Sequence, residues 1–321
     1  MGKIFIDPKV DWAFKRIFGQ EDTKELLLTF LNGLFEGEMV IKDVKFEKTE
    51  QIGLREDQRG IVFDVYCTTD EGKHIIVEMQ NKEQEYFVDR ALYYTARTIV
   101  GQGIKGSWNY HLTPVYTVCL MNFVSKDSML QDFRTDLALC NVKTGIRESE
   151  KFRIIYLMLP LFPKQSEAEC DNIFDCWIYV LKNMNMFEQM PFRDKYPVFR
   201  KLAKIGDLRK LSKEDLEKYD EDIKNMRDIY ATREFAVKQG RQEGREQGMQ
   251  EGIEKGIKQG MKQGIKQGMQ KGMEKGRKQG KAEGVKDQKI ASARMMLADG
   301  LSLDKVILYS GLTKEQIMKL N

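Results

Sequence analysis

The chain has 321 residues, 41% of them hydrophobic, which is enough for one large domain or two ordinary ones. The net charge of +4 is uneven: residues 238–286 carry 13 Lys and Arg against 6 Asp and Glu, a net +7, which leaves −3 for the rest. The chain has only two histidines, which argues against His-based zinc sites and against Ser-His or Cys-His catalysis. It has five cysteines without CxxC spacing, no signal-peptide pattern and no run of about 20 apolar residues. These features predict a cytoplasmic protein outside the membrane.

The first 165 residues show alternating helix-like and strand-like periodicity. Apolar spacings of three and four residues predict helices over 11–18, 23–35 and 86–103. Apolar runs predict strands over 40–46, 61–69, 74–80, 115–123 and 152–159, with a polar loop over 53–60. The order helix, three strands, helix, strand predicts an α/β fold in which helices pack on a mixed sheet.

The rest of the chain divides into three segments. Residues 166–235 are predicted to be a mainly helical extension, with helices over 173–186 and 215–235. Residues 236–286 form a basic repeat, and residues 287–321 a small helical module. The positive charge of the repeat indicates either affinity for polyanions or a solvated, solubilising segment.

Glycine recurs at every fourth position of the basic repeat. It does so twelve times from Gly240 to Gly284 and is often followed by Met, Ile or Val. Each repeat advances by about 40° on an α-helix, so the glycine and apolar stripes spiral around it. Twelve glycines disfavour a helix by about 10 kcal/mol relative to alanine. The pattern predicts a weakly helical self-association segment, which we favour, or a flexible linker; it is too polar for a membrane motif.

The last 35 residues read as three short helices. Gly300 and Gly311 separate them, and Thr313 is placed to cap the last one with Gln316 reaching back to it. Two interpretations are open: a helix-turn-helix unit and a small helical interaction module.

Residues 61–80 form a predicted β-hairpin whose register is set by its turn. A three-residue loop, 70–72, places Gly72 at the left-handed position that such loops require. Opposed residues then sum to 142, which puts six apolar side chains on one face: Phe63, Val65, Cys67, Ile75, Val77 and Met79.

The other face of this hairpin pairs Asp64 with Glu78 and Val62 with Gln80. Two adjacent carboxylates repel each other, and a divalent cation relieves that repulsion. Mg²⁺ prefers oxygen ligands and keeps waters that can attack a phosphodiester, and the Met79 carbonyl is a candidate third ligand. The alternative is a solvent-facing polar strand without a metal.

The chain resembles the PD-(D/E)XK nuclease superfamily in one motif: Asp64 is followed 14 positions later by Glu78-Met79-Gln80, within a helix–three-strand–helix–strand core. Within it, the chain is most similar to the recombination-promoting nuclease/transposase family (Rpn). The similarity covers residues 5–165. Its motifs are Asp11-x-x-Phe14-Lys15-x-x-Phe18-Gly19, Glu78-Met79-Gln80, Arg90-Ala91-Leu92-Tyr93-Tyr94 and Tyr110-x-Leu112-x-Pro114-Val115.

This resemblance implies a restriction-endonuclease-like core in residues 1–165, in which Asp64 and Glu78 bind Mg²⁺, or Mn²⁺ or Ca²⁺. It also implies that Gln80 takes the position usually held by a lysine. A neutral amide supplies no positive charge to a transition state. Lys82 and Arg90 are candidates to supply it, Lys82 only if the strand continues beyond Gln80.

Several other residues have both a functional and a structural interpretation. Arg90, Tyr94 and Arg97 share a helical face and either hold DNA phosphates or pack on the sheet, and packing is favoured for Tyr93. Asp11 and Lys15 form a surface ion pair or reach the metal site. His74 is expected to be a satisfied rim histidine rather than a ligand.

Three functions fit these observations. The first is a magnesium-dependent DNA endonuclease in recombination, mobile elements or defence, with no small-molecule cofactor. The second is a weak or inactive descendant that only binds DNA. The third is an assembly protein in which the glycine repeat drives homo-oligomerisation, most simply a dimer.

Overall fold

The computed structural model describes residues 3–51, 60–126 and 129–320. The chain divides into two compact units, Met1–Ala231 and Thr232–Asn321, which are described separately. Except for Gly60, the predicted polar loop over 53–60 lies outside the described residues. Among the described residues, no helix combines the length and apolar character needed to cross a membrane.

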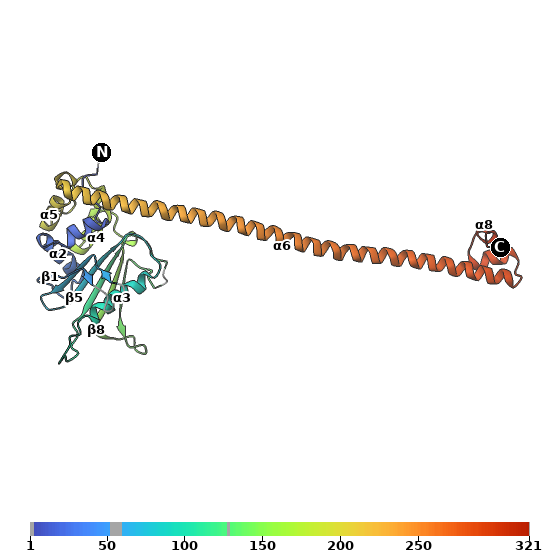
Figure 1. The fold of residues 1–321 in the computed structure, drawn as a ribbon, viewed down its shortest axis with the longest axis horizontal. Helices are drawn as coiled ribbons and strands as arrows, with labels where there is room; N and C mark the ends of the chain where they lie inside the picture. Colours follow the sequence, from blue (N-terminus) through green and yellow to red (C-terminus); the bar gives the residue numbers. More distant parts are fainter. Residues whose placement is uncertain (1–2, 52–59, 127–128, 321) are drawn as a thin grey trace. The chain divides into compact units, whose positions relative to one another are not determined.

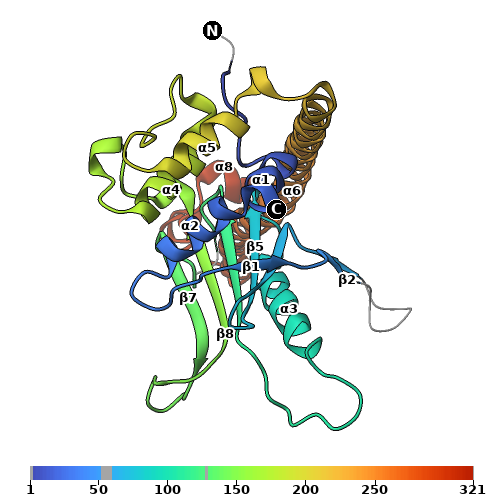
Figure 2. The ribbon, with the colours of Figure 1, turned by 90° about the vertical axis from the view of Figure 1, so that its left-hand side faces the viewer.

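The first unit is built on a six-stranded mixed sheet in the order β1-β4-β5-β6-β8-β7 (Figure 2). Strands β5, β6 and β8 are parallel, while β1, β4 and β7 run antiparallel to their neighbours. Every residue of β6 is buried, as the continuous apolar run predicts for a central strand. The strands are β1 Val44–Phe46, β4 Val65–Thr69, β5 His74–Gln80, β6 Val115–Met121, β7 Arg134–Cys140 and β8 Arg147–Met158.

Helices cover both faces of this sheet. Side chains alternate along β5, so Ile75 and Val77 join the large core under α1 and α2, while Ile76 packs on the opposite side with residues of α3. The predicted α/β class is confirmed, and within the six-stranded sheet so is the order helix, three strands (β1, β4 and β5), helix, strand. The helices of this unit are α1 Asp11–Phe18, α2 Lys24–Leu34, α3 Phe87–Val100, α4 Ile173–Asn183 and α5 Pro197–Ile205, with single turns at Glu21–Thr23, Leu159–Leu161, Glu167–Glu169, Met184–Met186 and Leu208–Lys210.

The β4–β5 hairpin has the predicted register. Val65 pairs with Val77 and Cys67 with Ile75, and Gly72 has a φ of 78° in a turn closed by its N–H on the Thr69 carbonyl, 2.9 Å away. A side chain in this left-handed region would be strained, which is why glycine stands there.

The predicted strand over 61–69 is interrupted. Ile61–Val62 (β3) pairs with Glu50–Gln51 (β2) in a separate two-stranded sheet, and the chain bends at residues 63–64 before β4 begins. The prediction that Phe63 shares the face of Val65 is therefore wrong: Phe63 packs against Tyr66 and the Tyr94 ring on the α3 side. The predicted pairing of Val62 with Gln80 is also wrong, because Val62 opposes Glu50.

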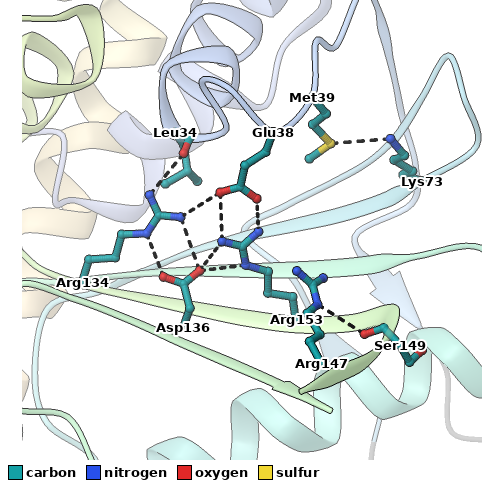
Figure 3. Close-up of polar contacts among 9 residues, drawn as sticks. All are labelled: Leu34, Glu38, Met39, Lys73, Arg134, Asp136, Arg147, Ser149 and Arg153. Atoms are coloured by element: carbon teal, nitrogen blue, oxygen red, sulfur yellow. Dashed lines mark hydrogen bonds and ion pairs between the residues drawn. The ribbon is translucent and has the colours of Figure 1, made fainter. Parts of the chain in front are cut away.

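An ion-pair cluster joins the residues after α2 to β7 and β8 (Figure 3). Arg153, only 8% exposed, contacts Asp136 at 2.6 Å and donates to both carboxylate oxygens of Glu38. Arg134 adds a bond to Asp136 of 2.8 Å and one to the Leu34 carbonyl of 3.3 Å. The buried guanidinium is thus neutralised on two sides, and hydrogen bonds from Arg153 hold the pKa of Glu38 below its usual value.

The helix α6 runs without interruption over Lys213–Ala298 (Figure 1), so it includes the predicted helix over 215–235 and the whole glycine repeat. At each of the twelve repeat glycines, no described atom outside the helix's own backbone lies within 4 Å of where a Cβ would stand. The apolar residues that follow them are exposed, from 48% at Val285 to 68% at Met261 and Met273.

The C-terminal unit ends in a small core formed by the last turns of α6 and the helices α7 (Leu303–Ser310) and α8 (Lys314–Met318). Gly300 and Gly311 have positive φ at the two turns. Thr313 and Gln316 form the predicted capping box, in which each side chain accepts the other residue's backbone N–H.

Candidate active site

Asp64 and Glu78 lie together and are held by reciprocal hydrogen bonds. The Asp64 Oδ2 atom accepts the Met79 N–H at 2.7 Å, and the Glu78 Oε1 atom accepts the Asp64 N–H at 3.2 Å. Glu78 comes from the regular strand β5, whereas Asp64 comes from the bend that precedes β4. The bend therefore brings the Asp64 backbone and side chain against the end of β5.

Burial makes this carboxylate pair electrostatically unfavourable. Desolvation, followed by the charge of Asp64, raises the pKa of Glu78 to about 8. Desolvation, opposed by the Met79 N–H and assisted by Asp11, raises the pKa of Asp64 to about 6. Glu78 is only 5% exposed, because α3 packs over the face that the sequence predicted to be outward. The pair therefore holds a proton near neutral pH or requires a cation.

Gln80 shares the face of Glu78, as predicted, and its Nε2 atom donates to Glu78 Oε2 at 3.3 Å. β5 ends at Gln80, so the condition under which Lys82 was expected to share that face is not met. The Lys82 ammonium group lies 4.2 Å from the centroid of the Tyr230 ring on α6. The prediction that the strand carries Lys82 toward the carboxylates is therefore wrong.

Positive charge reaches the carboxylates from α1 and α3 instead. The charges of Lys15 and Arg90 lower the pKa values of both Asp64 and Glu78 against the effect of burial. Lys15 also forms the expected ion pair with Asp11, 2.7 Å between Nζ and Oδ2. The ion-pair interpretation of Asp11 and Lys15 is thus confirmed, and the charges of both residues also shift the pKa of Asp64. Their reach to a metal ion stays a prediction.

The α3 residues that the sequence grouped together have different surroundings. The Arg90 guanidinium lies 5.8 Å from the Tyr94 ring and donates to Gln84. Tyr94 packs edge-on against Phe63, and Arg97 is 9% exposed, which favours packing over DNA contact for these two. Tyr93 is 43% exposed, so its predicted packing on the sheet is wrong.

His74 is a satisfied rim histidine, as predicted. Its Nδ1 atom lies 2.8 Å from the Tyr66 hydroxyl, and the two rings stack. Burial lowers the pKa of this imidazole because it disfavours the charged form.

The first turns of α6 form a wall of the site that the sequence did not predict. Asp222 accepts the Trp12 N–H at 2.9 Å and so caps the start of α1, which Figure 2 shows beside α6. Tyr219, buried at 3% exposed, accepts the Asp7 N–H at 2.8 Å. Between these turns and the end of β5 lies a cavity of about 350 Å³ lined by Asp11, Gln80 and Lys82 among others. Nothing in the local pattern of residues 213–231 indicates these contacts.

The donor set is suited to a hard cation. Within the described ranges, no three His, Cys, Asp or Glu side chains surround one point. Mg²⁺, however, is commonly held by one or two carboxylates and completes its shell with water. The two raised pKa values fit such an ion, because a divalent charge between Asp64 and Glu78 offsets their burial and repulsion.

Comparison with known families gives a match over residues 8–236 to the family described as PD-(D/E)XK nuclease family transposase. The matched region includes α1, the carboxylate hairpin, the helical extension and the first turns of α6. Comparisons with curated proteins and with solved structures give no match.

Proposed function

This chain belongs to the PD-(D/E)XK nuclease family transposases, and from that premise we propose that it is a metal-dependent endonuclease that hydrolyses phosphodiester bonds in DNA. The observation that carries the proposal is the pair formed by Asp64 and Glu78. Burial strains this pair electrostatically, and reciprocal backbone hydrogen bonds still hold it together. Acids whose pKa values are strongly raised by burial and by each other are concentrated at functional sites.

In this proposal Asp64, Glu78 and the Met79 carbonyl hold Mg²⁺, with Mn²⁺ or Ca²⁺ as alternatives. When bound, the ion activates water and offsets negative charge on the phosphate. Hydrogen bonds fix the carboxylates before any ion arrives, because Asp64 receives the Met79 N–H and Glu78 receives the Gln80 amide. The site is thus pre-organised by the chain itself.

Residues around the carboxylates supply the positive charge that the Gln80 amide lacks. A glutamine neither carries positive charge nor exchanges a proton near neutral pH. Lys15 and Arg90 already act electrostatically on both carboxylates, so we assign the missing positive charge to them rather than to Lys82. They would steady the negative charge that develops on the phosphate during attack.

The second candidate is a weak or inactive DNA-binding member of the family that acts through assembly. The observation that favours it is Gln80 at the position of the usual lysine. The basic repeat would contribute sequence-independent affinity for the DNA backbone, and its exposed apolar stripe would support a homodimer. Both candidates act in the cytoplasm, the compartment we propose from the reduced cysteines.

Plasmid nicking separates the two candidates. Full-length protein, Asp64→Ala, Glu78→Ala and the exposed control Glu85→Ala are incubated with supercoiled plasmid and Mg²⁺ or Mn²⁺. Nicking by the wild type and by Glu85→Ala but by neither of the other variants is the expected result. Equal nicking by all four proteins identifies a contaminating nuclease, and no nicking by any of them favours the DNA-binding candidate.

The role of the repeat is tested separately. A chain truncated after Phe235 and the full chain are compared by sedimentation. We expect the full chain to be dimeric and the truncated chain monomeric. If the two chains have the same assembly state, the repeat is not required for oligomerisation.

A further inference from the structure

The cavity beside the carboxylates has a composition unlike that of a phosphate site. It is bounded by the turn before α1, by the end of β5 and by one face of the first turns of α6. Its volume of about 350 Å³ lies in the range of about 300–1,000 Å³ typical of small-molecule pockets. It is therefore large enough to take a ring system rather than a single ion.

The formal charges around this cavity cancel. Lys9 and Lys82 contribute two positive charges, and Asp11 and Asp222 two negative ones. Lys9 already pairs with Asp7 at 2.8 Å, and Lys82 lies over the Tyr230 ring. A phosphate requires an excess of positive charge or several free N–H donors, so this cavity favours a neutral ligand.

The remaining lining combines apolar walls with amide groups. Val10, Met79, Met226 and Ile229 offer apolar surface, and thioethers pack well against aromatic rings. Four amides also line the cavity. The Gln80 amide nitrogen donates to Glu78, Asn81 donates to the Lys9 carbonyl and accepts from Asn122, and the Gln84 oxygen accepts from Arg90. The donor and acceptor edges for a base are therefore assigned to the Gln80 oxygen, the Gln84 nitrogen and the Asn225 amide. Flat apolar contact and paired donor–acceptor edges together are what a nucleobase requires.

Gln80 connects this cavity to the carboxylates. Its side chain lines the cavity and its Nε2 atom donates to Glu78 at 3.3 Å. Asp64 and Glu78 do not line the cavity themselves, so a group held there is linked to the acids through Gln80. We propose that the cavity receives a nucleobase extruded from the substrate strand, next to the phosphodiester to be cleaved. This inference rests on the proposed nuclease function and extends it to the preferred substrate, DNA with an unpaired base.

Extrusion requires least work when the base is already unpaired. The proposal therefore predicts that a duplex with one unpaired base binds more tightly than its fully paired counterpart. It also predicts that an abasic site at the same position does not reproduce the gain, because that duplex is equally interrupted but offers no base. The abasic duplex thus separates recognition of the base from recognition of bent or flexible DNA.

The experiment measures binding of the three labelled duplexes by fluorescence anisotropy at fixed salt. The full chain carries Asp64→Asn so that no cleavage occurs. We expect the unpaired-base duplex to bind at least about fivefold more tightly than the other two, within the range of a single base contact. Filling the cavity by Met226→Trp should abolish that preference, and the exposed control Met186→Trp, 69% exposed in the native chain, should keep it.

A second variant guards against misfolding. Asn225 is exposed on α6, so Asn225→Leu should remove one amide without disturbing the core. It should reduce the preference for the unpaired-base duplex over the abasic duplex. Equal binding of the abasic and unpaired-base duplexes would overturn the proposal, as would a preference that survives Met226→Trp in a folded protein. Failure of the nuclease function appears separately, as absence of plasmid nicking by the wild type.

Discussion

Glu78→Gln tests whether buried charge destabilises the site when no cation is bound. On folding, the pKa of Glu78 rises from 4.5 to about 8, so the folded protein keeps a proton that the unfolded chain has lost. The free energy of unfolding of the wild type therefore falls as pH rises from about 4.5 to about 8. Glutamine resembles the protonated acid and does not titrate, so the free energy of unfolding of the variant does not fall with pH in this way.

The size of the effect follows from the shift. At about 1.36 kcal/mol per pKa unit, the full shift corresponds to on the order of 5 kcal/mol. Asp64 carries part of the same repulsion. We therefore expect Glu78→Gln to raise the free energy of unfolding at pH 9 by about 2–4 kcal/mol, and to change it little at pH 5.

Urea denaturation in EDTA at the two pH values measures this difference. Tryptophan fluorescence reports the unit that contains the site, because Trp12, Trp108 and Trp177 all lie in it. The exposed Glu85→Gln serves as control. Mg²⁺ should stabilise the wild type at pH 9 and not Glu78→Gln. A difference between wild type and Glu78→Gln that is the same at both pH values would refute the electrostatic reasoning.

Three further variants probe other parts of the chain. Arg153→Ala leaves the carboxylates of the ion-pair cluster uncompensated and should lower the free energy of unfolding by about 2–3 kcal/mol in urea at pH 7, with a smaller effect at acid pH, where the pKa of Glu38 is approached. Gly72→Ala should cost about 1–2 kcal/mol in the same assay because φ is positive there, and an unchanged midpoint would contradict the turn. Replacing Gly256 and Gly260 by alanine meets no neighbour and should strengthen α6 by about 1 kcal/mol per site, raising its melting temperature in circular dichroism; loss of dimerisation would instead indicate close packing at these glycines.

The carboxylate hairpin was predictable because its information is local. A glycine at one position and apolar residues at alternate positions allow a single register, and that register brings Asp64 to Glu78. The alternation continues through Phe63, however, and conceals the bend at which Asp64 lies. Only the pairing of Ile61–Val62 with Glu50–Gln51 shows that the strand is interrupted, and this partner lies outside the local pattern.

The source of positive charge was less predictable for a similar reason. Lys82 has the right spacing only if β5 continues, and spacing does not reveal where a strand ends. Lys15 and Arg90 approach from helices on opposite faces of the sheet, so their effect on the carboxylates is a property of packing. The strand β7 and the helix α5 were also not predicted.

The wall of the cavity depends on contacts between residues far apart in the sequence. Asp222 and Trp12 are 210 residues apart, and their hydrogen bond anchors the helix that carries Asp11 and Lys15. During synthesis at about 5–20 residues per second, Asp222 leaves the peptidyl transferase centre about 10–40 seconds after Trp12. The nascent chain thus completes its carboxylate hairpin well before it can dock α1, and full assembly of the site is deferred until nearly all of the first unit has been translated.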